Sequence, residues 1–213
     1  MSEQISMRET ERKVFKTTFD DGLWDILLGC YFLGFVIALY LSPTLGDFWS
    51  SAVTIPILGL TFLGIYLIRK YIVNPRIGIV KFGRVRKTKL ARFTIVMLVI
   101  NAIAFILGII AAMNFGIVPG QVYSIIFGMI ILICFSFAAY FLDISRFYIY
   151  GLLVGLAPLV GEWLWSHGYA NHHGFPITFG IMASIMILIG LVIFIRILRN
   201  NPIPTEGITS EHT

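Results

Sequence analysis

Charged residues are scarce in this chain, making up 13% of its 213 residues against roughly 25% in an ordinary soluble domain. The hydrophobic share is 58% and the mean hydropathy is +0.88, so the composition excludes a typical water-soluble fold. Cysteine is almost absent. Cys30 and Cys134 both lie inside apolar stretches, without the C-x-x-C or Cys/His spacing of zinc and redox sites. We interpret both as small packing residues.

Ionisable side chains are missing from most of the long apolar stretches. Six stretches have about 20 mainly apolar residues, the length at which a helix crosses a bilayer with its backbone hydrogen bonds satisfied internally. They cover residues 23–41, 48–68, 93–113, 121–142, 147–165 and 177–195. The only Asp, Glu, Lys, Arg or His residues in them are Asp25, in the first, and Glu162, in the fifth. The sequence predicts an all-α polytopic membrane protein, with a six-helix transmembrane bundle over 23–195 between an N-terminal segment, 1–22, and a tail, 196–213.

The N-terminal segment carries a helix signal. Ser6 and Glu9 match a capping box, in which two side chains satisfy free amides of the first turn. Phe15, Phe19 and Leu23 continue on one face, which predicts a short amphipathic helix at the membrane surface. The first apolar stretch has 19 residues, more than the roughly 7–15 of a signal-peptide core, so we expect it to remain as a span.

Lysine and arginine are absent from three connections, 42–47, 114–120 and 166–176. All 16 basic residues lie in the other connections and the two terminal segments, and nine of them fall in the loop 69–92, which has no acidic residue. Because basic residues near span ends are retained on the cytoplasmic side, both termini are predicted to be cytoplasmic. This pattern, together with the lack of disulfide signals, is typical of a multi-pass protein of a prokaryotic plasma membrane. The same placement beside spans argues against nucleic-acid binding.

Proline is found deep in only two spans. Pro56 and Pro158 are expected to kink their helices, because proline removes a helix hydrogen bond. The two spans correspond under a three-plus-three division. Interrupted helices at matching positions of an inverted repeat can mark the substrate site of a transporter. The alternative interpretation is two ordinary kinks.

Small residues recur at helix-packing intervals. Gly151 and Gly155 lie four apart in the fifth span, and Ala104, Gly108 and Ala112 follow one face of the third. Such residues let helix backbones approach closely in a membrane. The three connections without basic residues are short, which predicts that the spans form three antiparallel hairpins.

The long basic loop opens with Asn74-Pro75, which predicts a turn followed by a short extended segment. Pro75, Arg76, Gly78 and Val80 form a Pro-Arg-x-Gly-x-Val sequence. On these residues and the hydropathy pattern, the chain resembles a group of uncharacterised prokaryotic multi-spanning membrane proteins. The resemblance covers about a dozen residues of the chain's 213 and implies no activity.

Basic side chains of this loop are candidates for contact with anionic lipid headgroups or a phosphorylated ligand, each contributing on the order of 1 kcal/mol near the surface. The candidates are Arg76, Lys81, Arg84, Arg86, Lys87 and Lys89. The loop lacks the glycine-rich motifs that place backbone amides against phosphates. A purely topological role for these charges is the alternative.

The predicted outer end of the fifth span has the one cluster suited to site chemistry. Its candidate metal ligands are Glu162, His167, His172 and His173, since zinc binds carboxylate and imidazole. Their spacing matches no helical metal motif. The alternatives are an interfacial glutamate with solvated histidines, among an aromatic belt containing Trp163 and Trp165, or pH sensing by the histidines.

Two further polar residues lie within spans. Asp25 shares a predicted helix face with Asp21, and pairing with a basic residue from a connection would explain its position. Asn101 is expected to make an interhelical hydrogen bond. The favoured function is a non-enzymatic membrane protein, transporter-like or an accessory subunit, without a cofactor. Its expected partners are the bilayer, anionic lipids, and another membrane protein or a second copy. Alternatives are a membrane-embedded metal-dependent enzyme and a module that binds lipids or partners through loop 69–92.

Overall fold

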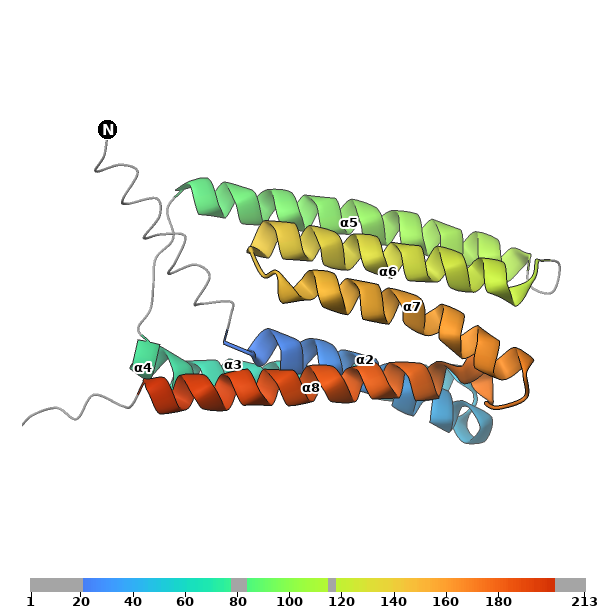
Figure 1. Ribbon diagram of the computed structural model, residues 1–213, viewed down its shortest axis with the longest axis horizontal. Helices are drawn as coiled ribbons and strands as arrows, with labels where there is room; N and C mark the ends of the chain where they lie inside the picture. The colour runs from blue at the N-terminus through green and yellow to red at the C-terminus, as the bar shows by residue number, and fades with distance from the viewer. Residues whose placement is uncertain (1–20, 78–83, 115–117, 202–213) are drawn as a thin grey trace, which may run out of the picture.

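The computed structural model describes residues 21–77, 84–114 and 118–201, and the ordered elements of that part are all helical (Figure 1). The elements are α2 (Leu23–Leu45), α3 (Asp47–Ile68), the π-helix η1 (Arg69–Val73), α4 (Asn74–Ile77), α5 (Arg84–Met113), α6 (Gly120–Leu142), α7 (Arg146–Ser166), the 3-10 helix η2 (His172–Gly174) and α8 (Phe175–Asn200). Six of these segments are long and apolar enough to span a membrane. The prediction of an all-helical chain with six potential spans is confirmed. The predicted N-terminal helix and most of the tail lie outside the described residues.

Two expected breaks in the helices are wrong. Residues 42–47 were expected to form a loop, but α2 continues to Leu45 with Pro43 inside it, and Gly46 alone connects it to α3. Gly46 has φ +77, a conformation that glycine adopts without strain and that permits so tight a connection.

Asn74-Pro75 was expected to be a turn, but both residues are helical in α4. Proline is tolerated in the first turn of a helix, where its missing N–H is not needed. The preceding π-helix has wider hydrogen-bonded turns, and the Asn74 N–H donates to the Arg69 carbonyl. The segment after Ile77, for which an extended conformation was predicted, lies outside the described residues up to 83.

The helices pack in the spatial order α3, α2, α8, α7, α6, α5. Figure 1 shows α5, α6 and α7 on one side and α2, α3 and α8 on the other, and α7 packs against α8 between them. The three predicted hairpins are confirmed, since α2 packs on α3, α5 on α6, and α7 on α8. The inverted repeat is not reproduced by this packing, because α3 and α5 do not pack together as their counterparts α7 and α8 do.

Glycines bring two pairs of helices into close contact, α2 with α8 and α6 with α7. A Cβ on Gly22 would collide with the carbonyl oxygen of Gly190, at the junction of α2 and α8. A Cβ on Gly128 of α6 would collide with the carbonyl oxygen of Gly155 of α7. A Cβ on Gly151 would come within 2.7 Å of the Phe135 Cβ. The predicted packing role of Gly151 and Gly155 is confirmed.

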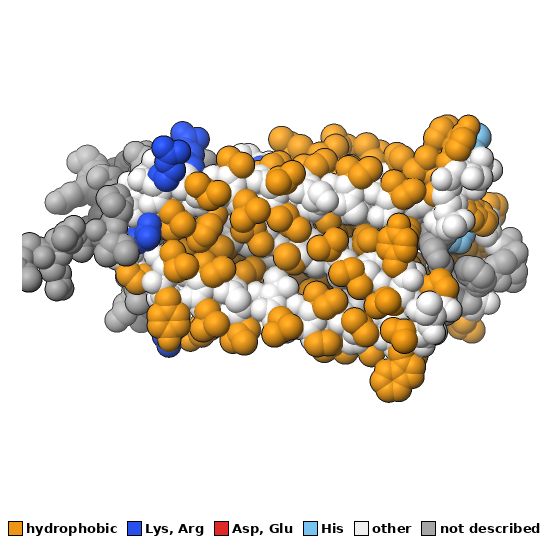
Figure 2. Space-filling model, turned by 90° about the horizontal axis from the view of Figure 1, so that it is seen from below, with side chains coloured by type: hydrophobic (Ala, Val, Ile, Leu, Met, Phe, Trp, Pro, Cys, Tyr) orange, Lys and Arg blue, Asp and Glu red, His pale blue; other side chains and the backbone are white. Residues whose placement is uncertain are grey.

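Gly108, one of the three small residues predicted to share a packing face of α5, behaves differently. A Cβ on Gly108 would meet nothing within 4 Å, so no other described helix of the chain comes close to α5 at this position. No residue in the apolar windows of α3 or α5 is buried, because these helices lie at the two ends of the row. Figure 2 shows hydrophobic side chains covering the length of the bundle, with Lys and Arg at one end.

Candidate functional site

Polar side chains gather at the two opposite ends of the bundle. One end, the basic end, is where α2 and α7 begin and carries Arg69, Lys89 and Arg146. The other, the His173 end, holds Glu162 near the end of α7. Asn101 lies at neither end. It is exposed on α5, and its Nδ2 donates a hydrogen bond to the Met97 carbonyl within the same helix, at 2.8 Å. The three polar intramembrane candidates, Asp25, Asn101 and Glu162, therefore do not share a site.

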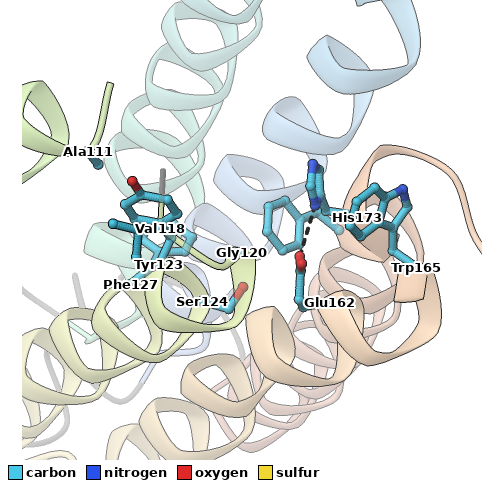
Figure 3. A pocket seen from close by; sticks show the side chains of 10 residues that line it. Ala111, Val118, Gly120, Tyr123, Ser124, Phe127, Glu162, Trp165 and His173 are labelled. Carbon is cyan, nitrogen blue, oxygen red and sulfur yellow. Dashed lines mark hydrogen bonds and ion pairs between the residues drawn. The ribbon is translucent and has the colours of Figure 1, made fainter. Parts of the chain in front are cut away.

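A cavity of about 470 Å³ opens at the His173 end, between α5, α6, α7 and the start of α8 (Figure 3). Most of its wall is apolar. The lining residues are Ala111, Val118, Gly120, Tyr123, Ser124, Phe127, Glu162, Trp165, His173 and Phe175. Its volume falls in the range of about 300–1,000 Å³ that is typical of small-molecule sites.

An acid–imidazole pair forms the polar part of the wall. The His173 Nδ1 lies 2.8 Å from Glu162 Oε2, as Figure 3 shows by a dashed line. The Glu162 side chain is 6% exposed and that of His173 is 40% exposed. Because Nδ1 is engaged by the carboxylate, Nε2 is the ring nitrogen left to meet a ligand or water.

Two glycines bring this pair together. A Cβ on Gly174 would collide with the Gly161 carbonyl oxygen, and a Cβ on Gly161 would lie 2.7 Å from the His173 carbonyl oxygen. The backbone on either side of the pair is therefore in direct contact. His173 itself has φ +54, which is uncommon for a residue with a Cβ. Its ring lies over Trp165, with the ring centroids 4.3 Å apart.

The Glu162 carboxylate also packs against the first residue of α6. A Cβ on Gly120 would collide with Glu162 Oε1, so a larger residue here would require the carboxylate to shift. Sequence reasoning missed Gly120 and Ser124, since no spacing in the chain links the start of α6 to Glu162.

The remaining candidate metal ligands do not join this pair in the described structure. The His167 Nδ1 lies 2.9 Å from the Trp163 carbonyl oxygen, and its ring stacks on Tyr169. The side chain of His172 lies outside the described residues. Within the part of the chain that is described, no group of three or more His, Cys, Asp or Glu side chains could hold a metal ion.

At the basic end, Asp25 is fully buried and makes a two-pronged ion pair. Arg146 Nε and Nη2 donate to its two carboxylate oxygens at 2.8 and 2.6 Å. Pairing of Asp25 with a basic residue from a connection is thereby confirmed, with the partner at the first position of α7. The Tyr150 hydroxyl is buried beside this pair and has no hydrogen-bond partner of acceptable geometry among the described residues.

The sequence predicted that Asp21 lies on the same helix face as Asp25. In the structure Asp21 instead precedes α2, which begins at Leu23. Its carboxylate accepts the Leu23 N–H at 3.1 Å and pairs with Arg69 at 2.6 Å. Burial raises the pKa of Asp21 above its ordinary value, although the Arg69 guanidinium opposes the shift. A raised folded-state pKa means that the stability contributed by Asp21 is lost as pH rises through that value.

Two of the basic loop candidates are engaged with the bundle. Arg76 Nη1 donates to the Leu198 carbonyl at 3.0 Å, and Lys89 pairs with Asp143 at 3.0 Å. Lys81 and the side chains of Arg84, Arg86 and Lys87 lie outside the described residues. Pro56 is exposed and Pro158 is buried, and both lie inside helices without a break.

Comparison of the chain with protein-family models, with curated proteins and with solved structures finds no match. The resemblance based on the Pro75–Val80 sequence stays a prediction. Function must be argued from the geometry of the two ends.

Proposed function

We propose that this chain is a non-enzymatic membrane protein that binds a small amphipathic molecule in the cavity at the His173 end, as a carrier or accessory subunit does. The observation that carries the proposal is the cavity itself, an apolar chamber with one acid–imidazole pair in its wall. Apolar pockets with a few convergent polar groups are the usual form of small-molecule sites. The positive-inside rule supports a cytoplasmic basic end, with the cavity at the outer face.

The pair is better suited to binding than to nucleophilic catalysis. Ser124 lines the same cavity, but no described hydrogen bond joins its hydroxyl to His173, as the serine–histidine pair of a hydrolase requires. Zinc sites use three or four protein ligands, and the described residues bring two candidates together. The metal-dependent enzyme is therefore the less supported alternative.

Filling the cavity tests the proposal. Ala111→Phe places an aromatic ring in the chamber without touching the acid–imidazole pair, and it is expected to weaken saturable binding of a bromine-labelled dodecyl amphiphile at least about tenfold, a loss of about 1.4 kcal/mol. Bromine quenches nearby tryptophans, so quenching of a variant whose only tryptophan is Trp165 measures binding in lipid vesicles.

Ala102→Phe is the matched control, since it adds the same ring to an exposed position of the same helix. Equal binding by both variants, or quenching of the parent that rises linearly without saturation, would overturn the binding proposal.

A second candidate, an accessory role through self-association, is favoured by the exposed face of α5. Asn101 and Gly108 lie two turns apart on this face, and a Cβ on Gly108 meets open space. An asparagine amide both donates and accepts hydrogen bonds, so two copies of this face complement one another. In lipid, polar side chains and small residues stabilise such contacts.

Cysteine crosslinking in native membranes tests this interface. In a Cys30→Ser/Cys134→Ser background, Gly108→Cys is expected to give a disulfide-linked dimer on mild oxidation. Ile103→Cys, which is exposed on another face of α5, is expected to give none. Adding Asn101→Leu to Gly108→Cys should reduce the dimer fraction several-fold, as expected for loss of roughly 1 kcal/mol. Equal crosslinking at both positions would contradict this interface.

A further inference from the structure

Charge in the cavity wall limits which amphiphile it can hold. Among the described residues of the lining, Glu162 is the one acidic residue and His173 the one basic residue, and none is a lysine or arginine. With Glu162 ionised, the wall has a net charge of minus one when His173 is neutral and zero when it is protonated. In both states the side chains of the described lining therefore carry no net positive charge to attract a sulfate, phosphate or carboxylate headgroup.

The carboxylate has capacity for a further donor. The His173 bond uses Oε2, whereas an ionised carboxylate accepts about four hydrogen bonds. Gly120, the first residue of α6, packs against the other carboxylate oxygen, Oε1. Glu162 lines the cavity, and no lysine or arginine is among the described lining residues to cancel its charge.

The other polar contacts of the cavity suit a cation as well. Aromatic rings of Tyr123, Phe127, Trp165 and Phe175 line the wall, and the faces of such rings attract ammonium groups. Trp165 lies over the His173 ring, so the best of these aromatic surfaces is next to the acid. Beyond it, the apolar wall is suited to an alkyl chain.

On these observations, and resting on the proposed binding function, we infer that the ligand is a cationic amphiphile, with an ammonium group at Glu162 and an apolar tail along the aromatic wall. The described basic residues that form ion pairs with Asp21, Asp25 and Asp143 lie at the opposite end of the bundle, where they cannot oppose the cation. The cavity thus discriminates between ligands by the sign of the headgroup charge.

Three probes that share a brominated dodecyl tail test the inference. Their headgroups are primary ammonium, maltoside and sulfate. The full chain with Trp165 as its only tryptophan is placed in zwitterionic vesicles, and quenching is compared at equal membrane-bound probe concentration. Binding of the ammonium probe is expected to be about tenfold tighter than that of the sulfate probe, with maltoside between them.

Glu162→Gln should abolish most of this preference while leaving maltoside binding within about twofold. Asp143→Asn is the matched control, because it removes the same charge at the basic end, at a φ of +59 that asparagine accepts. It should leave the preference unchanged. His173→Gln, which keeps the Glu162 carboxylate, should retain or increase the preference for the ammonium probe. If Glu162→Gln does not fold, this second variant still tests the preference.

The outcomes separate the two proposals. Saturable binding of all three probes with equal affinity would overturn the cation preference and leave the binding function standing. Tighter sulfate binding, or loss of the ammonium preference in His173→Gln, would also overturn it. Absence of saturable quenching for every probe would overturn the binding function itself.

Discussion

Replacing Arg146 with methionine is expected to lower the free energy of unfolding by about 3–5 kcal/mol. Asp25 is 0% exposed and its only described ion pair is with Arg146, so the variant leaves a buried carboxylate without a cation. The Tyr150 hydroxyl beside it can donate one hydrogen bond but supplies no charge. Titration with a denaturing detergent in mixed micelles, followed by helix content, measures the loss.

Two variants accompany this measurement. Lys89→Met breaks the pair with Asp143, whose side chains are 27% and 19% exposed, and it should cost no more than about 1 kcal/mol. The double variant Asp25→Leu/Arg146→Met removes both charges, so it should recover most of the stability lost in the single variant. If Arg146→Met were no less stable than Lys89→Met, Asp25 would not depend on its partner.

Hydropathy predicted the six long helices, and the short connections predicted their pairing into hairpins. Membrane spans must satisfy their own backbone hydrogen bonds, so length and apolar content alone identify the helices. The errors fell where helix continuation depends on local conformation. Gly46 makes a one-residue connection possible, and the π-helix before Asn74 lets the chain stay helical through Pro75. Neither is visible in hydropathy.

The candidate site was only partly predictable. Glu162 and His173 stood out because polar residues near a span are rare, but their pairing depends on the contact between Gly161 and Gly174. The opposite wall comes from α5 and α6, and no sequence spacing relates Gly120 or Ser124 to Glu162. Asp25 was likewise evident as a charge within a span, whereas the choice of Arg146 over nearby basic residues depends on how α7 packs against α8, which in turn packs against α2.

Phe179→Ala is expected to produce the second large loss, about 3–5 kcal/mol of unfolding free energy. Phe179 is 0% exposed and packs among four aromatic rings. These rings are Phe32, Phe35, Phe127 and Phe175, with centroid distances of 5.6, 5.5, 6.2 and 6.0 Å. Phe105→Ala is the control, because that ring is 71% exposed on α5, and its loss should stay within about 0.5 kcal/mol.

The same variant tests how the cavity is closed on its inner side. Phe127 and Phe175 line the cavity and both contact Phe179, so removing this ring should deepen the chamber towards the middle of the bundle. In the Phe179→Ala variant, a brominated ammonium probe with a longer tail should then gain affinity relative to the dodecyl probe, when the same two probes are compared in the parent chain. At a concentration of about 100 times its Kd it should restore about 2.7 kcal/mol of stability. A variant that loses stability without any change in tail-length preference would place Phe179 in the core but not in the floor of the cavity.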